Sequence, residues 1–306
     1  MNIVFFGTPD FAVNILKSLV NSNHKVVGVV TKIDKPVGRK QILTQSPVKI
    51  FAKENNIPVF QFKKIRLEGY DALKNVNADI FITCAYGQII PQEVLDLPKY
   101  KTINIHFSLL PQYRGASPVQ WALINGEKET GITIMQTDAG IDTGDIILQK
   151  PLCIEKNDNT ESLLQKLSLL SIEPLFKVLE SFEINTIKFK KQGENATYYP
   201  MLKKEDGKID FNKSSDEILN LIKGLVMWPV AYCNLDEKIL KIYDAETTVS
   251  SKDGVNGEVV VCDKTGIIIK CGKGYLKLNI LQLEGSKILN YKDFLNGNKI
   301  IGKVLR

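Results

Sequence analysis

Asn104 and His106 are the first side chains in the sequence whose types and spacing suggest chemistry. They lie in a short apolar run, Thr102–His106, that predicts a strand, and residues two apart on a strand project from the same face. A side-chain amide can donate to a developing oxyanion, and an imidazole can accept, relay or orient a proton near neutral pH. An isolated histidine can also be structural, so the residues alone leave both interpretations open.

An acidic segment, Asp138–Asp145, contains three aspartates and two glycines in eight residues. One of its carboxylates could orient His106 or take up its proton, and the glycines would let the backbone pass close to a ligand. The spacing of the acids does not match a calcium loop, which needs D-x-[DN]-x-[DN]-G followed by a glutamate. A plain acidic turn remains an alternative.

Residues 108–115 follow His106 directly and have the composition of a binding surface. Leu109, Leu110 and Pro111 could wall an apolar slot for a ring, and Arg114 could hold an anion or a neighbouring carboxylate. Taken alone, this segment is a weak signal.

Other cofactor and metal patterns fail in this sequence. Gly7 is followed by Thr, Pro and Asp, which disfavours a dinucleotide fingerprint, and residues 38–49 lack the phosphate-binding pattern G-x-x-x-x-G-K-[ST]. The five cysteines show no C-x-x-C spacing and the chain has two histidines, so we expect reduced, mostly buried thiols and no metal site.

The candidate residues need a scaffold, and the first half of the chain predicts one. Apolar strand patterns alternate with helical patterns that open at Thr8-Pro9, Ser46-Pro47 and Ser117-Pro118. This alternation predicts an α/β fold, a Rossmann-like and mostly parallel sheet with helices on both faces. Two further strands follow close together and are expected at the end of the sheet, and one long helix over about residues 160–182 closes the domain. Such sheets place their sites at the carboxyl ends of strands, where Gly7–Asp10, Asn104–Gly115 and Asp138–Asp145 fall.

The second half of the chain has a different composition. Residues 188–208 read as a basic linker, and five short strands with tight turns follow a capped helix at Ser214–Leu225. We therefore expect three parts: a catalytic domain over residues 1–187, the linker over 188–208, and a smaller OB-like β-barrel domain over 209–306.

Charge is unevenly distributed along the chain. The net charge is +6, of which residues 188–306 carry +5, from 20 basic and 15 acidic side chains. A polyanionic partner would explain this basic region, although a solvated lysine-rich surface explains it equally well. The amino terminus reads directly into a strand, and no apolar run approaches the roughly 18 residues that span a bilayer. We expect a cytoplasmic monomer with no membrane contact.

Several motifs recur in an order typical of one enzyme family. They are Phe6-Gly7-Thr8-Pro9-Asp10-Phe11-Ala12, Asn104–Pro111, Tyr113-Arg114-Gly115-Ala116-Ser117-Pro118, Thr130-Gly131-Ile132-Thr133 and Asp138–Asp145. Together they resemble the folate-dependent formyltransferases, which share the Asn-x-His and Asp-x-Gly-x-Asp elements. Ser46-Pro47-Val48-Lys49, Lys204–Asp210 and Trp228-Pro229 are similar to features of one branch, the methionyl-tRNA formyltransferase family. The resemblance runs nearly end to end.

This resemblance implies transfer of a formyl group from 10-formyltetrahydrofolate to the α-amino group of methionine on initiator tRNA. By motif, Asn104 would stabilise the oxyanion, His106 would assist proton transfer and Asp142 would orient the histidine. The folate slot would be lined by Gln88, Ile89, Ile90, Ser108, Leu109, Leu110, Pro111 and Asp138. The tRNA would be held by Arg39, Lys40, Lys203, Lys204 and the carboxy-terminal barrel. No metal is required.

The sequence departs from the family pattern at two places. The basic loop reads Gly38-Arg39-Lys40 in place of Gly-Arg-Gly, so a lysine stands where the family has its second glycine. The family's Trp-Pro-Gly-Ala is Trp228-Pro229-Val230-Ala231 here. Two alternatives remain: a formyltransferase that acts on an amino-sugar nucleotide or another amine, and a catalytically inactive tRNA-binding protein.

Overall fold

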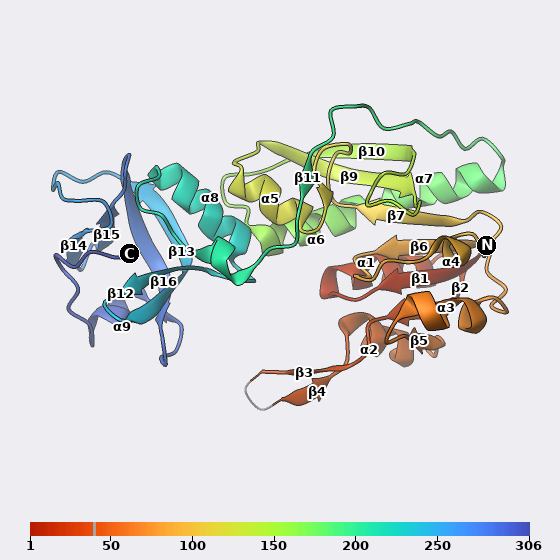
Figure 1. Cartoon of the computed structure of the whole chain (residues 1–306), viewed down its shortest axis with the longest axis horizontal. Helices are drawn as coiled ribbons and strands as arrows, with labels where there is room; N and C mark the ends of the chain where they lie inside the picture. Colours follow the sequence, from red (N-terminus) through yellow and green to blue (C-terminus); the bar gives the residue numbers. More distant parts are fainter. Residues whose placement is uncertain (39–40) are drawn as a thin grey trace. The chain divides into compact units, whose positions relative to one another are not determined.

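A computed structural model describes residues 1–38 and 41–306 of the chain. The chain divides into two compact units (Figure 1). The N-terminal unit consists of Met1–Gly115, Glu129–Cys153 and Leu164–Tyr198, and the C-terminal unit of Ala116–Lys128, Ile154–Leu163 and Tyr199–Arg306. Each unit consists of three separate stretches of the chain, so the two units interleave along the sequence. The predicted division at residues 187 and 208 stays a prediction.

A seven-stranded sheet forms the centre of the N-terminal unit, in the order β10-β9-β7-β6-β1-β2-β5. Its strands are β1 (Asn2–Gly7), β2 (Lys25–Thr31), β5 (Val59–Gln61), β6 (Ile80–Cys84), β7 (Thr102–His106), β9 (Glu129–Gln136) and β10 (Ile146–Cys153). The five neighbouring strands β7, β6, β1, β2 and β5 run parallel to one another, while β9 and β10 add antiparallel pairs at one edge. The predicted Rossmann-like, mostly parallel sheet is therefore confirmed.

Both faces of this sheet are covered, which explains why β1 and β6 are apolar runs without alternation. Val4 and Phe6 of β1 pack with residues of α3 (Ile65–Leu73) and α4 (Gln92–Leu95). Ile3 and Phe5 point to the opposite face and are also fully buried. The remaining helices of this unit include α1 (Asp10–Val20), α2 (Pro47–Glu54) and α7 (Ile172–Glu183). Ser46 caps α2 by accepting a hydrogen bond from Lys49 N at 3.1 Å, as its sequence predicts.

The prediction of one long helix over residues 160–182 is wrong. The structure has two helices, α6 (Thr160–Leu170) and α7, and Ser171 separates them. Pro174 explains the break, because proline lacks the N–H that an uninterrupted helix would use and is tolerated in a first turn.

The C-terminal unit is built on an antiparallel sheet in the order β12-β13-β16-β15-β14, with β17 paired to β16. Its strands are β12 (Ala231–Leu235), β13 (Lys238–Thr248), β14 (Val259–Asp263), β15 (Gly266–Lys270), β16 (Tyr275–Leu283) and β17 (Leu289–Asn290). The last residues of the chain join its two edges: Leu305 N donates to Gly257 O just before β14, and Arg306 N donates to Asn234 O of β12. The tail thus closes the sheet, in agreement with the predicted small barrel.

Helices α8 (Ser215–Leu225), α5 (Pro118–Ile124) and α9 (Tyr291–Leu295) complete the C-terminal unit. A capping box between Ser214 and Glu217 starts α8, and Ile218 and Ile222 of α8 pack into the core of the barrel. Before the barrel, a short 3-10 helix η1 (Lys204–Gly207) contacts β12. Gly207 lies so close to this strand that a Cβ there would be 2.7 Å from Val230 O.

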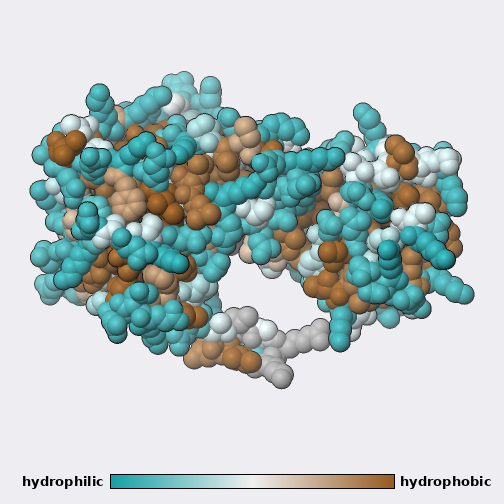
Figure 2. All heavy atoms as spheres, turned by 180° about the vertical axis from the view of Figure 1, so that it is seen from behind, coloured by the Kyte–Doolittle hydropathy of each residue, from teal (hydrophilic) through white to brown (hydrophobic). Residues whose placement is uncertain are grey.

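A two-stranded hairpin, β3 (Lys35–Val37) and β4 (Ile42–Thr44), flanks the predicted basic loop. Arg39 and Lys40 lie outside the described residues. Ile42 and Leu43 are 62% and 66% exposed, and Figure 2 shows apolar surface beside the residues drawn in grey. Among the residues that the structure describes, no helix is long and apolar enough to cross a membrane.

Candidate active site

The predicted reacting groups lie at the carboxyl end of β7, inside the sheet. Asn104 is paired with Thr83 of β6 on one side and with Met135 of β9 on the other, and His106 is paired with Thr133. His106 is 6% exposed. Because the neighbouring strands fix the direction of both side chains, Asn104 and His106 project together as their spacing predicts.

Asp142 is the acid of the 138–145 segment that meets this pair. Its Oδ1 lies 3.6 Å from His106 Nδ1 and 3.5 Å from Asn104 Nδ2, so one carboxylate oxygen faces both groups. Its Oδ2 accepts a hydrogen bond of 2.8 Å from Gly115 N. The structure therefore brings Asn104, His106 and Asp142 together, whereas the sequence alone left the choice among three aspartates open.

The main chain sets the tautomer of His106. Its Nε2 lies 2.9 Å from the carbonyl oxygen of Tyr113, and a carbonyl can only accept, so Nε2 carries a hydrogen and donates it. In the neutral ring Nδ1 is then the basic nitrogen, and it is the nitrogen that faces Asp142. A proton arriving on Nδ1 would place an imidazolium next to a carboxylate, which stabilises the charged ring.

The amide of Asn104 is also held in one orientation. Thr83 Oγ1 donates to Asn104 Oδ1 at 2.8 Å, which leaves the NH₂ group as the end that points toward Asp142. An amide NH₂ has two donors, so it can face Asp142 and still donate to a developing oxyanion.

The acidic segment folds against the end of β9, and this close packing of backbone on backbone requires glycine. A Cβ on Gly144 would lie 1.7 Å from Gln136 O, so only glycine fits there. Asp138 bonds within the segment, because its carboxylate accepts from Thr143 Oγ1 at 2.8 and 2.9 Å and from Gly140 N at 3.1 Å. The predicted contact between Asp138 and folate is untested by these bonds.

The segments predicted to line the folate slot follow β6 and β7, two neighbouring parallel strands. Ser108 and Leu110 are buried, and Thr133 Oγ1 holds this turn by donating to Ser108 O at 2.7 Å and accepting from Leu110 N at 3.1 Å. Leu109 and Pro111 are half-buried. The turn after β7 is thus rigidly tied to the sheet.

The segment after β6 contributes Gln88, Ile89 and Ile90. Gln88 Nε2 donates to Phe62 O at 2.9 Å, and Gln88 Oε1 accepts from Ile65 N at 3.1 Å. Its amide thus anchors the start of α3. Ile89 is 78% exposed, and Ile90 is half-buried against the core under α3. Their predicted contact with folate stays a prediction.

Sequence reasoning missed three residues that position the site. The role of Thr83 could not be predicted, because no motif surrounds it in the sequence. Tyr113 acts through its backbone carbonyl, which any residue type would supply. Gln192 comes from the predicted linker and reaches the Asp142 turn. The guanidinium of Arg114 donates to Gln192 Oε1 at 2.9 and 2.8 Å, and its expected contact with an anion or a carboxylate stays a prediction.

Other groups near the site are unsuited to nucleophilic or metal chemistry. Cys84 ends β6 next to Thr83, and burial raises the pKa of its thiol to about 12, so it stays protonated and inert. In the part of the chain that the structure describes, no group of three His, Cys, Asp or Glu side chains is arranged to hold a metal ion.

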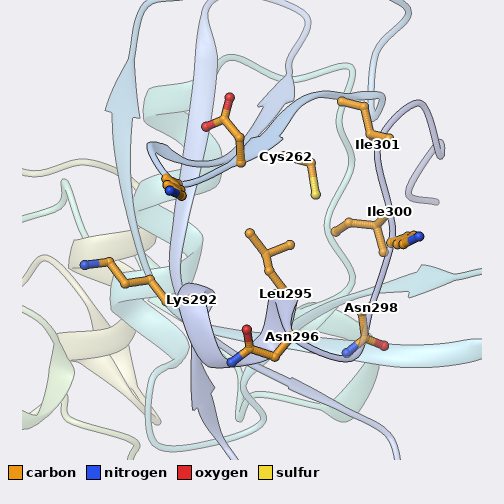
Figure 3. A pocket seen from close by; sticks show the side chains of 10 residues that line it. Cys262, Lys292, Leu295, Asn296, Asn298, Ile300 and Ile301 are labelled. Atoms are coloured by element: carbon orange, nitrogen blue, oxygen red, sulfur yellow. The ribbon is translucent and has the colours of Figure 1, made fainter.

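A cavity of about 580 Å³ lies in the C-terminal unit (Figure 3). Its lining includes Cys262, Leu295 and Ile300 together with the lysines Lys264, Lys292 and Lys299. None of the predicted site residues lines it.

Comparison with known proteins covers both units. The family described as formyl transferase matches residues 1–179, and the formyl transferase C-terminal domain matches residues 201–299. A methionyl-tRNA formyltransferase of Geobacter metallireducens is 45% identical over 302 residues, which are 98% of this chain and 96% of that protein. The corresponding protein of Lachnospira eligens is 43% identical over 312 residues, 100% of this chain and 99% of its own.

Solved structures show the same fold. The sugar 3N-formyl transferase WlaRD, crystallised with dTDP and 5-N-formyl-THF, superposes with a TM-score of 0.68 and 26% identity over 94% of this chain and 99% of that chain. A methionyl-tRNA formyltransferase from Clostridium thermocellum superposes with a TM-score of 0.58 and 20% identity over 81% and 94% of the two chains. The chain therefore belongs to the formyl transferase family.

Proposed function

We propose that this chain transfers the formyl group of 10-formyltetrahydrofolate to the α-amino group of methionine esterified to initiator tRNA. The observation that carries the proposal is the identity of 42–45% to methionyl-tRNA formyltransferases over 97–100% of the chain, which includes the basic second half. The cluster of Asn104, His106 and Asp142 supports the chemical step.

The reaction needs one proton moved and one oxyanion stabilised. An α-amino group has a reference pKa of about 7.7–8.0, so a neutral fraction can attack the formyl carbon near neutral pH. As the new C–N bond forms, the carbonyl electron pair moves to oxygen, where Asn104 Nδ2–H would stabilise it. His106 Nδ1 takes the proton from the amine, with Asp142 stabilising the imidazolium. Return of that proton to the departing folate nitrogen accompanies cleavage of the old C–N bond.

Binding of the two substrates would use different surfaces. The turns after β6 and β7, with Gln88–Ile90 and Ser108–Pro111, would hold the pterin, and Asp138 would contribute from the acidic segment. Arg39 and Lys40, which come between β3 and β4 in the sequence, would contact the tRNA, as would Lys203 and Lys204. Both Lys203 and Lys204 are exposed, and the net charge of +5 over residues 188–306 favours a polyanion.

An amino-sugar nucleotide is the competing acceptor, because the WlaRD structure is that of a sugar 3N-formyl transferase. Its identity of 26% is well below the 45% shared with the Geobacter enzyme, so tRNA is the better supported acceptor. We also propose that the protein works as a monomer in the cytoplasm, where translation begins.

The test compares wild-type protein and the His106→Ala variant in formylation of charged initiator tRNA with 10-formyltetrahydrofolate. We expect wild-type protein to formylate the tRNA and to leave a dTDP-linked amino sugar unchanged. His106→Ala should lower turnover by about 100-fold or more, since positioned proton transfer contributes that much, while tRNA affinity stays unchanged. His24→Ala is the matched control, because His24 bonds the amino-terminal nitrogen of Met1 instead. Formylation of the sugar but not the tRNA would overturn the acceptor, and near wild-type turnover of His106→Ala would overturn the mechanism.

A further inference from the structure

Gln192 lies in the segment that follows α7, and all the hydrogen-bonding capacity of its side-chain amide is used at the active site. Its Nε2 donates to Asp142 O and to Gly144 O, each at 2.8 Å. Its Oε1 accepts from Arg114 Nε at 2.9 Å and from Arg114 Nη2 at 2.8 Å. A primary amide has two N–H donors and two acceptor lone pairs, so each of them has a partner.

The Asp142 turn is held by contacts from outside its own segment as well as by those within it. Asp142 has a φ of 53°, in the left-handed region, which is uncommon for residues other than glycine, although aspartate adopts it more readily than most. Contacts from the surroundings help to keep the turn in this conformation. Gln192 does so by binding the carbonyls of Asp142 and Gly144 with one NH₂ group.

Gln192 also fixes the second contact of the Asp142 carboxylate. Asp142 Oδ2 accepts from Gly115 N, and the residue before Gly115 is Arg114, whose guanidinium is bound to Gln192. The two backbone stretches on either side of the carboxylate are thus joined through one side chain.

The segment that contains Gln192 also holds the backbone that binds His106, the partner of Asp142. Thr197 Oγ1 accepts from Tyr113 N at 2.8 Å, and Thr197 O accepts from Arg114 N at 2.9 Å. Tyr113 in turn supplies the carbonyl that binds His106 Nε2. Residues 192–197 therefore anchor both the acceptor of His106 and the turn of Asp142.

We propose that Gln192 is a positioning residue for formyl transfer, which sets the placement of Asp142 relative to His106 Nδ1. This inference rests on the proposed function. Without the Gln192 amide the left-handed turn at Asp142 loses its two donors, and the carboxylate moves away from the imidazole. The loss falls on the chemical step, because Gln192 itself need not touch either substrate.

The test is the Gln192→Ala variant in steady-state formylation of charged tRNA. We expect kcat to fall about 10- to 100-fold, as is typical when a supporting hydrogen bond is removed or a reacting group is displaced by about 1 Å. KM for both substrates should change less than about threefold. Gln92→Ala is the matched control, because the Gln92 amide donates to Asp96, the residue that follows its own short helix α4, far from Asp142 in the sequence. Unchanged kcat in Gln192→Ala would overturn the inference.

A double-mutant cycle with Asp142→Asn separates positioning from general loss of structure. If Gln192 acts through Asp142, adding Gln192→Ala to Asp142→Asn lowers kcat less than about threefold further. If the kcat losses of the two single variants multiply in the double variant, the two residues act independently and the proposal is contradicted. Gln192→Glu guards against misfolding: it keeps a partner for Arg114 but cannot donate to the two carbonyls, so it should lose turnover as Gln192→Ala does. Inactivity of wild-type protein toward charged tRNA would contradict the proposed function instead.

Discussion

At the scale of single residues, the carbonyl of Tyr113 determines which nitrogen of His106 is left to accept a proton. It occupies Nε2, so in the proposed mechanism the proton from the substrate amine would go to Nδ1, next to Asp142. The distance of 3.6 Å between Nδ1 and Oδ1 is longer than a hydrogen bond, so the carboxylate lies beside Nδ1 without bonding it directly. In the proposed mechanism, a proton on Nδ1 would add an attraction between the ring and this carboxylate.

Thr83 offers a test of how far the orientation of Asn104 matters. Thr83→Val keeps the volume of the side chain but removes the donor to Asn104 Oδ1. The freed amide can rotate, so we expect kcat to fall about 10-fold or more, because misplacing an oxyanion donor costs much of the ~100-fold that its loss would cost.

Thr102→Val is the control for this change, since Thr102 lies on the same sheet and its Oγ1 donates to Leu95 O of α4 and not to Asn104. Both variants should lose about 1 kcal/mol of stability with their hydrogen bond, but only Thr83→Val should lose turnover. Equal turnover of the two variants in the formylation assay would contradict the role of Thr83.

Residue chemistry explains which parts of the site could be predicted. Asn104 and His106 share one strand, so a period of two was enough to place them together. Asp142 required a choice among three aspartates, which the residues left open and the family resemblance supplied. Gln192 is 50 positions from Asp142 in a segment without any period, and such a contact depends on the path of the chain through space.

At the scale of secondary structure, the strands of the N-terminal unit were predictable because burial on both faces produces unbroken apolar runs. The break between α6 and α7 was not found, although Pro174 marks it. In the barrel, the sequence predicts short strands, but β13 extends over 11 residues to Thr248. Its extension pairs with β16 and ends in exposed polar residues, a pattern that carries no strand signal of its own.

Val230, where the family pattern has glycine, is the residue in the barrel whose backbone is least suited to its type. Its φ is 71°, and a β-branched residue in this region is a strained outlier. Val230→Ala keeps that strain and Val230→Gly removes it. We expect Val230→Gly to be more stable than Val230→Ala by about 1 kcal/mol, although glycine buries fewer atoms.

The measurement is urea unfolding followed by tryptophan fluorescence, because both tryptophans, Trp121 and Trp228, belong to the C-terminal unit. Ala231→Gly, in the first position of β12, is the control, and it should destabilise by about 0.5–1 kcal/mol. A glycine at 230 that destabilises more than alanine would show that strain is not the dominant effect there.

At the scale of the whole molecule, charge and chemistry are carried by different stretches of the sequence. Asn104, His106 and Asp142 precede residue 188, whereas residues 188–306 hold +5 of the net charge of +6. Phosphate contacts supply affinity without sequence information, so this basic stretch would contribute affinity and the hairpin and active site would contribute choice. Composition could predict this division, but it could not tell a tRNA surface from a lysine-rich solvated one.

Lys203 and Lys204 provide the measurement that separates these two interpretations. Both are exposed at the start of η1, and replacing them with alanine removes two positive charges without removing a buried contact. If each neutralises one phosphate, the slope of log Kd against log salt concentration should fall by about 1.4–1.8 for the double variant, at about 50 to 200 mM salt. The loss of affinity should be similar for different tRNAs, and kcat at saturating tRNA should not change.

A double Lys17→Ala, Lys25→Ala variant removes the same charge from exposed positions of the N-terminal unit and should leave the slope unchanged. Equal slopes for the two double variants would mean that net charge alone attracts the tRNA and that Lys203 and Lys204 form no defined contact.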